Sequence, residues 1–123
     1  MWHYKKLDVW RKARLLAREV YRTSDGWPRS ELYGLTTQVR RAAVSVGANI
    51  AEGSGRSSPG EYAQFLGYAM GSLNEVEHHL IIARDLGFPV EAGVTDVMSD
   101  VGRMLHRLRT ATLDRAAKPN RQR

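Results

Sequence analysis

Cysteine is absent from this chain of 123 residues. That absence excludes a disulfide framework and thiolate chemistry. Long apolar runs are missing as well, because no stretch approaches the ~20 consecutive apolar residues that span a bilayer. The first six residues also lack the apolar block of a secretory signal. We therefore expect a soluble, cytoplasmic protein that has no membrane partner.

Strand patterns are also lacking, since no segment alternates apolar and polar residues with period two. Instead, four segments place apolar residues three and four positions apart, which is typical of amphipathic helices. We predict helices at about residues 8–23, 31–53, 59–86 and 93–113. Their lengths are comparable and their connections short, so the predicted fold is all-α, an antiparallel up-and-down four-helix bundle over residues 1–114. An open helical array completed by another subunit is the alternative.

Polar and small residues mark the ends of the predicted helices. Ser30 is placed to cap the second helix. Ser58 and Glu61 belong to a capping-box pattern that begins the third helix, and Gly87 fits the left-handed position that closes it. The residues from 115 to 123 are basic and interrupted by proline, so a flexible tail is expected after the fourth helix.

The stretch from residue 48 to 61, A-N-I-A-E-G-S-G-R-S-S-P-G-E, invites comparison with a phosphate-binding loop. A Walker-type loop needs Gly-Lys-Ser/Thr after a strand, whereas this stretch lacks that sequence and follows a predicted helix. A helix end, a tight turn and a capped restart explain it better, with Gly53 and Gly55 setting the turn. Glu52 is expected to pair with Arg56, four residues later.

The second and third helices are predicted to form a hairpin that places Ala42 opposite Gly71. Gly67 and Gly71 are interpreted as packing glycines, because a glycine inside a helix costs roughly 1 kcal/mol and small residues let helices approach closely. Asn49 is expected to bond across the hairpin, near Gln64, because buried polar groups need partners.

Residues that could carry catalysis are few. The serines on the predicted helices have no nucleophile-elbow pattern around them, so a hydrolase triad is not supported. Di-metal bundles repeat a Glu-x-x-His motif on two helices, and only one copy exists here, from Glu75 to His78. We expect a protein that is not an enzyme and binds no cofactor. The alternative is a metal-binding bundle or an enzyme that uses Glu75, His78 and His79.

The net charge of +6 is distributed unevenly along the chain. Residues 1–23 and 101–123 carry +5 and +6, whereas residues 61–100 carry −6. The first predicted helix places four arginines on one side, where they form a basic stripe. This polarity suits acidic polymers such as RNA or DNA, or copies of the same chain. The candidate nucleic-acid or subunit contacts are Arg11, Arg14, Arg18, Arg22, Arg56, Arg107 and Arg109.

Four stretches of the sequence carry a resemblance to a known family. They are Tyr4-x-x-Leu7-x-Val9-Trp10-x-Lys12-Ala13, Tyr33-Gly34-Leu35-Thr36-x-Gln38-Val39-Arg40-Arg41-Ala42-Ala43-Val44-Ser45, Asn49-Ile50-Ala51-Glu52-Gly53-x-Gly55-Arg56 and Gly71-Ser72-Leu73-x-Glu75. Together they resemble the small four-helix-bundle proteins named for the 23S rRNA intervening sequence. The residues that this resemblance marks as a structural signature are Arg40, Arg41, Asn49, Glu52, Gly53, Gly55, Gly71 and Ser72.

The resemblance implies an antiparallel bundle that assembles into a ring of five. Some members are encoded inside rRNA genes, and a related branch, the accessory variability protein of diversity-generating retroelements, binds nucleic acid and a reverse transcriptase. Gly47 stands where the family usually has proline, so a softer kink is expected in the second helix. We therefore expect a non-enzymatic homo-oligomer, pentameric by resemblance, that acts as an RNA-binding, accessory or scaffold protein. Its expected partners are RNA, DNA or a protein such as a reverse transcriptase.

Overall fold

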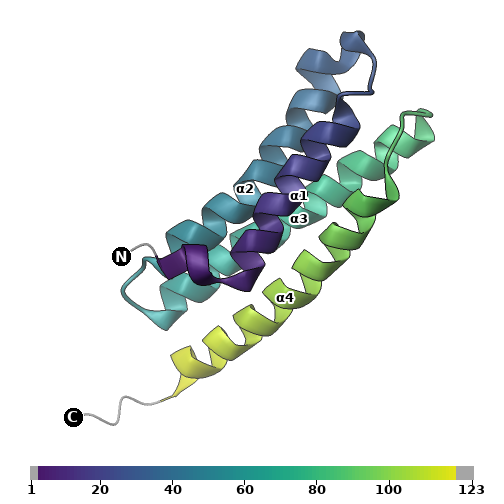
Figure 1. Ribbon diagram of the computed structural model, residues 1–123. Helices are drawn as coiled ribbons and strands as arrows, with labels where there is room; N and C mark the ends of the chain where they lie inside the picture. Colours follow the sequence, from purple (N-terminus) through teal and green to yellow (C-terminus); the bar gives the residue numbers. More distant parts are fainter. Residues whose placement is uncertain (1–2, 119–123) are drawn as a thin grey trace.

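The computed structural model describes residues 3–118 and confirms the all-α four-helix bundle (Figure 1). Its long helices, which run antiparallel, are α1 (Asp8–Ser24), α2 (Thr37–Ser54), α3 (Pro59–Asp85) and α4 (Ala92–Ala117). Short helical segments precede α1 and α2, namely η1 (His3–Lys6), η2 (Arg29–Glu31) and η3 (Leu32–Thr36). Because α4 packs against α1 as well as α3, the bundle closes on itself and is not an open array.

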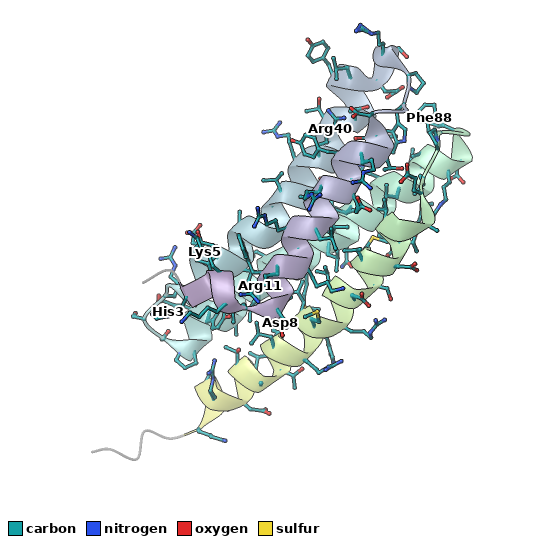
Figure 2. All side chains as sticks on the ribbon, in the orientation of Figure 1. His3, Lys5, Asp8, Arg11, Arg40 and Phe88 are labelled. Atoms are coloured by element: carbon teal, nitrogen blue, oxygen red, sulfur yellow. The ribbon has the colours of Figure 1, made fainter. Side chains whose placement is uncertain are left out.

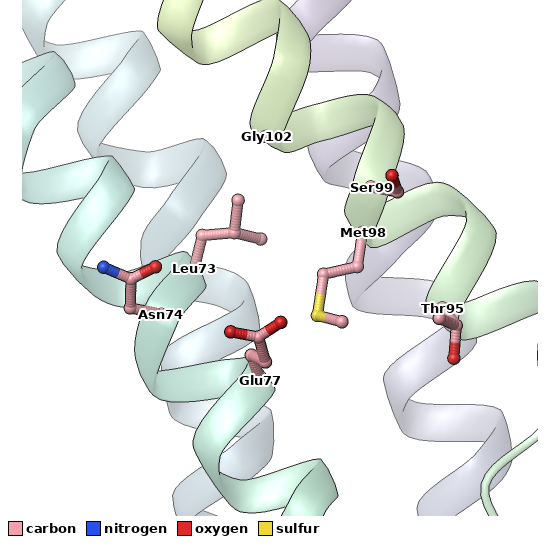
Figure 3. Close-up of a pocket in the computed structure, with 7 residues that line it drawn as sticks. All are labelled: Leu73, Asn74, Glu77, Thr95, Met98, Ser99 and Gly102. Carbon is pink, nitrogen blue, oxygen red and sulfur yellow. The ribbon is translucent and has the colours of Figure 1, made fainter.

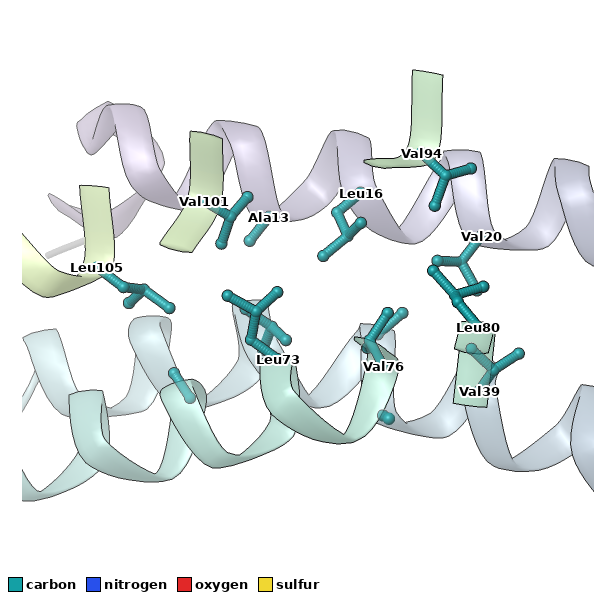
Figure 4. Packing of buried hydrophobic residues seen from close by; sticks show 14 of the residues in the cluster. Ala13, Leu16, Val20, Val39, Leu73, Val76, Leu80, Val94, Val101 and Leu105 are labelled. Atoms are coloured by element: carbon teal, nitrogen blue, oxygen red, sulfur yellow. The ribbon is translucent and has the colours of Figure 1, made fainter. Parts of the chain in front are cut away.

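One apolar core runs along the bundle axis, and every long helix contributes to it (Figure 4). Leu16 of α1, Val39 of α2, Val76 of α3 and Val101 of α4 are fully buried. Burying a side chain of this kind contributes about 1.5–3 kcal/mol relative to leaving it exposed, so this inward stripe holds the fold together. Across residues 3–118, no helix is both long and apolar enough to cross a membrane.

The start of α2 differs from the sequence prediction. Ser30, the predicted cap, lies inside η2 and does not cap α2. The side chain of Glu31 instead caps η3, because its Oε1 accepts a hydrogen bond from the Leu35 amide at 3.2 Å. Gly34 then breaks the helix with φ −117° and ψ −113°, and regular α-helix begins only at Thr37.

Both ends of α3 follow the predicted chemistry. The Ser58 hydroxyl accepts a hydrogen bond from the Glu61 amide at 3.2 Å, which confirms the N-cap. After Asp85 the chain turns at Gly87, which has φ +79°, a conformation that glycine adopts without strain. The Phe88 amide donates back to the Ala83 carbonyl at 2.8 Å, so the last carbonyls of α3 find partners.

The fourth helix is longer than predicted. It runs to Ala117, so Arg115 and the two alanines after it are helical and do not belong to a flexible tail. The remainder of the predicted tail, residues 119–123, lies outside the described residues.

The turns at one end of the bundle are tied together by polar contacts. The carbonyl oxygen of Pro89, between α3 and α4, accepts hydrogen bonds from Trp27 Nε1 at 2.8 Å and from the Thr23 hydroxyl at 3.2 Å. The same hydroxyl accepts from the Glu91 amide at 3.0 Å. The α1–α2 and α3–α4 connections are therefore fastened to each other, which holds α4 on the bundle.

The register of the α2–α3 hairpin differs from the prediction by about one helical turn. The hydroxyl groups of Ser45 and Ser72 lie 2.9 Å apart and bridge the two helices, so Ala42 does not lie opposite Gly71. A Cβ atom added at Gly71 would meet nothing within 4 Å, so its interpretation as a packing glycine is wrong. A Cβ added at Gly67 would lie 3.3 Å from the Arg109 guanidinium, so Gly67 faces α4 instead of α2.

The glycine that the hairpin does require is Gly53. A Cβ atom there would lie 2.6 Å from Phe65 Cβ and 3.1 Å from Tyr62 Cδ1, far closer than ordinary contact. Gly53 is buried inside α2 and has an ordinary helical backbone. Its function is therefore close approach to α3, whereas the sequence suggested that it sets the turn.

Gly53→Ala should lower the free energy of unfolding by about 1–3 kcal/mol, because the new methyl group overpacks against α3. Urea denaturation measures this change. Gly55→Ala is the matched control, since a Cβ there would lie 3.6 Å from the nearest atom, and it should stay within about 0.5 kcal/mol of wild type. Equal stability of the two variants would contradict the close-approach explanation.

Candidate cationic interface

The four arginines of α1 lie on its outward side, as the sequence pattern indicates. Apolar α1 residues such as Leu16 and Val20 are fully buried, and the arginines occupy the opposite side of the helix. All four are exposed to solvent: Arg11, Arg14, Arg18 and Arg22. The structure therefore presents a continuous basic stripe along α1.

The partners of these arginines differ. Arg11 donates from Nε to the Lys5 carbonyl at 2.9 Å, and Figure 2 shows these two residues together where η1 meets α1. Arg22 lies 3.4 Å from Glu19, and the guanidinium of Arg14 lies 6.0 Å from the centre of a Trp10 ring. Arg18 has no ion pair within residues 3–118.

The basic stripe continues across the α1–α4 seam. Lys12 lies 3.2 Å from the Asp100 carboxylate, which fixes α4 beside α1 in antiparallel orientation. Arg103 also pairs with Asp100, and Arg107, one turn further along α4, is exposed. Because the helices are antiparallel, Arg107 lies toward the N-terminal end of α1. The sequence prediction omitted Arg103, although it lies four residues from Arg107 and so on the same side of a helix.

We define the cationic face as the four exposed arginines of α1 together with Arg103 and Arg107 of α4. An exposed guanidinium in water binds carboxylate or phosphate oxygens through paired N–H groups. The members of the cationic face are Arg11, Arg14, Arg18, Arg22, Arg103 and Arg107.

Arg109, predicted to belong with these residues, does not lie on the cationic face. It is half-buried, and its Nε donates to the Ala63 carbonyl of α3 at 3.2 Å. Its guanidinium lies over Gly67, where a side chain would crowd it. Arg109 therefore joins α4 to α3, and its contact with nucleic acid or another subunit stays a prediction.

Arg56, at the α2–α3 turn, folds back onto the hairpin. Its Nη2 lies 2.6 Å from Glu52 Oε2, so the predicted pair is present, and its guanidinium carbon lies 4.5 Å from the centre of the Phe65 ring. Arg56 thus covers the ring of Phe65, the residue whose Cβ packs against Gly53. Beside it, partial burial raises the pKa of the Tyr62 hydroxyl, and the positive charge of Arg115 opposes that rise.

Arg40 and Arg41 are neighbours in the sequence with different surroundings. Arg40 reaches back to the end of α1, where its Nε donates to the Ser24 hydroxyl at 2.8 Å and its Nη2 to Asp25 Oδ1 at 3.0 Å. Its guanidinium also stacks on Tyr21, 4.6 Å from the ring centre. Arg41 is exposed and has no ion pair within residues 3–118. Arg40 therefore fastens α2 to the C-terminal end of α1, where a cation is favoured.

Asn49 contributes to the hairpin indirectly. Its Nδ2 donates to the carbonyl and the hydroxyl of Ser45, at 2.9 and 3.0 Å, and Ser45 in turn contacts Ser72. The predicted bond toward Gln64 is wrong, because Gln64 donates to the Tyr68 hydroxyl on its own helix. The register thus depends on a chain of three polar side chains that crosses from α2 to α3.

The alternative metal site has little support in its geometry. His79 Nε2 lies 3.3 Å from Glu75 Oε2 one turn away, and His78 is exposed beside them. Across residues 3–118, no three side chains of the His, Asp or Glu type come together in a way that could hold a metal ion. Glu75 and His79 therefore form a surface hydrogen bond beside the exposed His78.

A protein-family model described as 23S rRNA-intervening sequence protein matches residues 5–110. The matched range begins in η1 and ends in α4, so it includes all of α1, α2 and α3, most of α4 and every member of the cationic face. The comparison with curated proteins gives no match.

Arg40→Ala should lower the free energy of unfolding by about 1.5–3 kcal/mol, because it leaves a buried serine hydroxyl without its charged partner. Arg41→Ala, the adjacent control, should change stability by less than about 0.5 kcal/mol. Thermal or urea unfolding, followed by circular dichroism, compares the two. A larger loss for Arg41→Ala would contradict the roles assigned to these residues.

Proposed function

The chain belongs to the 23S rRNA-intervening sequence protein family, and on that premise we propose that it is a non-enzymatic homo-oligomer of the cytoplasm that binds nucleic acid through its cationic face. The observation that supports this proposal is the gathering of exposed arginines along α1 and across the α1–α4 seam. The carboxylate of Asp100 is shared by Lys12 and Arg103, so it does not pair with the arginines around them, which remain available to a polyanion.

The expected mode of binding is contact with phosphates. Guanidinium groups on an exposed helix meet phosphate oxygens without burying unpaired charge, and each contact releases counterions from the nucleic acid. Such contacts carry no sequence information, so binding should be weakly sequence-specific and strongly salt-dependent. An RNA and a DNA strand should both bind, with RNA as the preferred candidate from the family's description.

The assembly we propose is a head-to-tail ring of five copies, the number that the family resemblance implies. A cyclic assembly joins one surface of each copy to a different surface of the next. The chain supplies surfaces of opposite charge, because residues 1–23 carry +5 and residues 61–100 carry −6. Such complementarity favours the correct pairing and fast association. A ring would also serve as a scaffold for a protein partner such as a reverse transcriptase.

The double variant Arg11→Glu/Arg107→Glu tests the nucleic-acid proposal, because it reverses charge on both sides of the α1–α4 seam. For about four phosphate contacts, wild-type affinity for a single-stranded RNA should fall roughly 50-fold between 50 and 200 mM salt, and the variant's by about sevenfold if two contacts are lost. Fluorescence anisotropy titration measures both.

Arg29→Glu serves as the control, since Arg29 is exposed in η2, at the end of the bundle opposite Arg11 and Arg107, and does not belong to the cationic face. It should bind RNA nearly as wild type does. RNA binding by the double variant that equals wild type at both salt concentrations would overturn the nucleic-acid proposal. Light scattering on the same samples reports the mass of the assembly. A double variant that loses its assembly would instead assign these arginines to a subunit contact.

A further inference from the structure

The outer side of the α2–α3 hairpin exposes apolar surface that the bundle does not cover. Val44 of α2 and Tyr68 of α3 are 51% and 49% exposed. They lie beside the Ser45–Ser72 bridge, which holds the two helices together at this level. We call this surface the hairpin face and define it by Val44, Ala48, Tyr68, Gly71 and Glu75, all of which are exposed.

No packing contact within residues 3–118 explains why residue 71 is a glycine. It lies in the middle of the 27-residue α3, where glycine costs roughly 1 kcal/mol relative to alanine. A Cβ at Gly53 would collide with α3, and one at Gly67 would crowd Arg109, yet one at Gly71 would enter open space. The missing side chain therefore leaves the backbone of α3 open to an approaching surface, between two exposed apolar side chains.

Two sides of the molecule carry charges of opposite sign. Glu75, one turn from Gly71, is half exposed, and its partner is the His79 ring of the same helix at 3.3 Å. On α1, Arg14 and Arg18 have no carboxylate partner within residues 3–118. The contacts of α1 with α2 and α4, and of α3 with the same two helices, place α1 and α3 diagonally across the bundle. The acidic and the basic surfaces of one copy therefore face in different directions.

We propose that the hairpin face is the docking site for α1 of a second copy of this chain, which rests on the homo-oligomer of the proposed function. The arginine stems of the second copy lie over Val44 and Tyr68, where the aromatic ring attracts a guanidinium. The charged heads reach Glu75, and Gly71 allows the helices to approach closely. Because the two surfaces differ, the contact is head-to-tail, which is the kind of contact that a cyclic assembly uses.

This docking divides the cationic face between two tasks. Arg14 and Arg18 meet the neighbouring copy, whereas Arg11 and Arg107, beside the α1–α4 seam, stay available to nucleic acid. The two tasks can therefore be separated by mutation.

The variant Gly71→Leu tests the docking site, because its side chain enters open space in one copy and blocks a second copy. Sedimentation velocity of the full chain should show at least a tenfold weaker association than wild type, with unchanged helix content by circular dichroism. Asn74→Leu is the matched control. It places a leucine at an exposed position of α3, three residues from Gly71. Asn74 lines the pocket between α3 and α4 that Figure 3 shows, outside the hairpin face, so this variant should assemble as wild type does.

A charge exchange tests the pairing itself. Glu75→Arg and Arg18→Glu should each weaken assembly at least tenfold, and the double variant should recover most of the loss, because opposite charges face one another again. A double variant that recovers nothing overturns the pairing of α1 with the hairpin face. If Gly71→Leu assembles as tightly as wild type, the docking site is overturned while the homo-oligomer stands. If the wild-type chain sediments as a monomer, the homo-oligomer itself is overturned.

Discussion

The close approach of α2 to α3 at Gly53 is the contact on which much of the structure depends. Phe65 Cβ and Tyr62 occupy the space that a side chain at this position would need. Arg56 then covers the Phe65 ring from the solvent side while it pairs with Glu52. The two helices are thus in contact close to the turn that joins them. About two helical turns farther from that turn, the Ser45–Ser72 bridge fixes their register.

The opposite end of the bundle is held by polar contacts instead of close backbone packing. Arg40 joins α2 to the last turn of α1. The Pro89 carbonyl accepts hydrogen bonds from Thr23, at the end of α1, and from Trp27, in the connection that follows α1. The two bonds to Pro89 join residues that are more than 60 positions apart in the chain, and Arg40 lies 16 positions from Ser24. Because both ends are fixed, the helices between them present their outer sides as well-defined surfaces, and those surfaces are where partners can bind.

The outer surfaces differ in chemistry. The side of α1 and α4 is rich in exposed arginine, and Lys12 and Asp100 hold the two helices together beneath it. The outer side of the hairpin exposes two apolar side chains, Val44 and Tyr68, together with the carboxylate of Glu75. Electrostatic attraction acts at long range and suits a polyanion, whereas apolar surface gains free energy only in direct contact. For this reason we assign nucleic acid to Arg11 and Arg107 of the cationic face, and α1 of a second copy to the hairpin face.

The sequence alone determined the features that depend on residues three or four positions apart. These are the number of long helices, the cap at Ser58, the left-handed Gly87 and the basic stripe of α1, because helical periodicity and capping are local. Only the tertiary structure decided which glycine is a close contact and which is open, since Gly53 and Gly71 look alike in sequence. It also decided that Arg40 joins α2 to the end of α1. The partners of a long side chain belong to another helix, and no local sequence pattern encodes how the two helices are aligned.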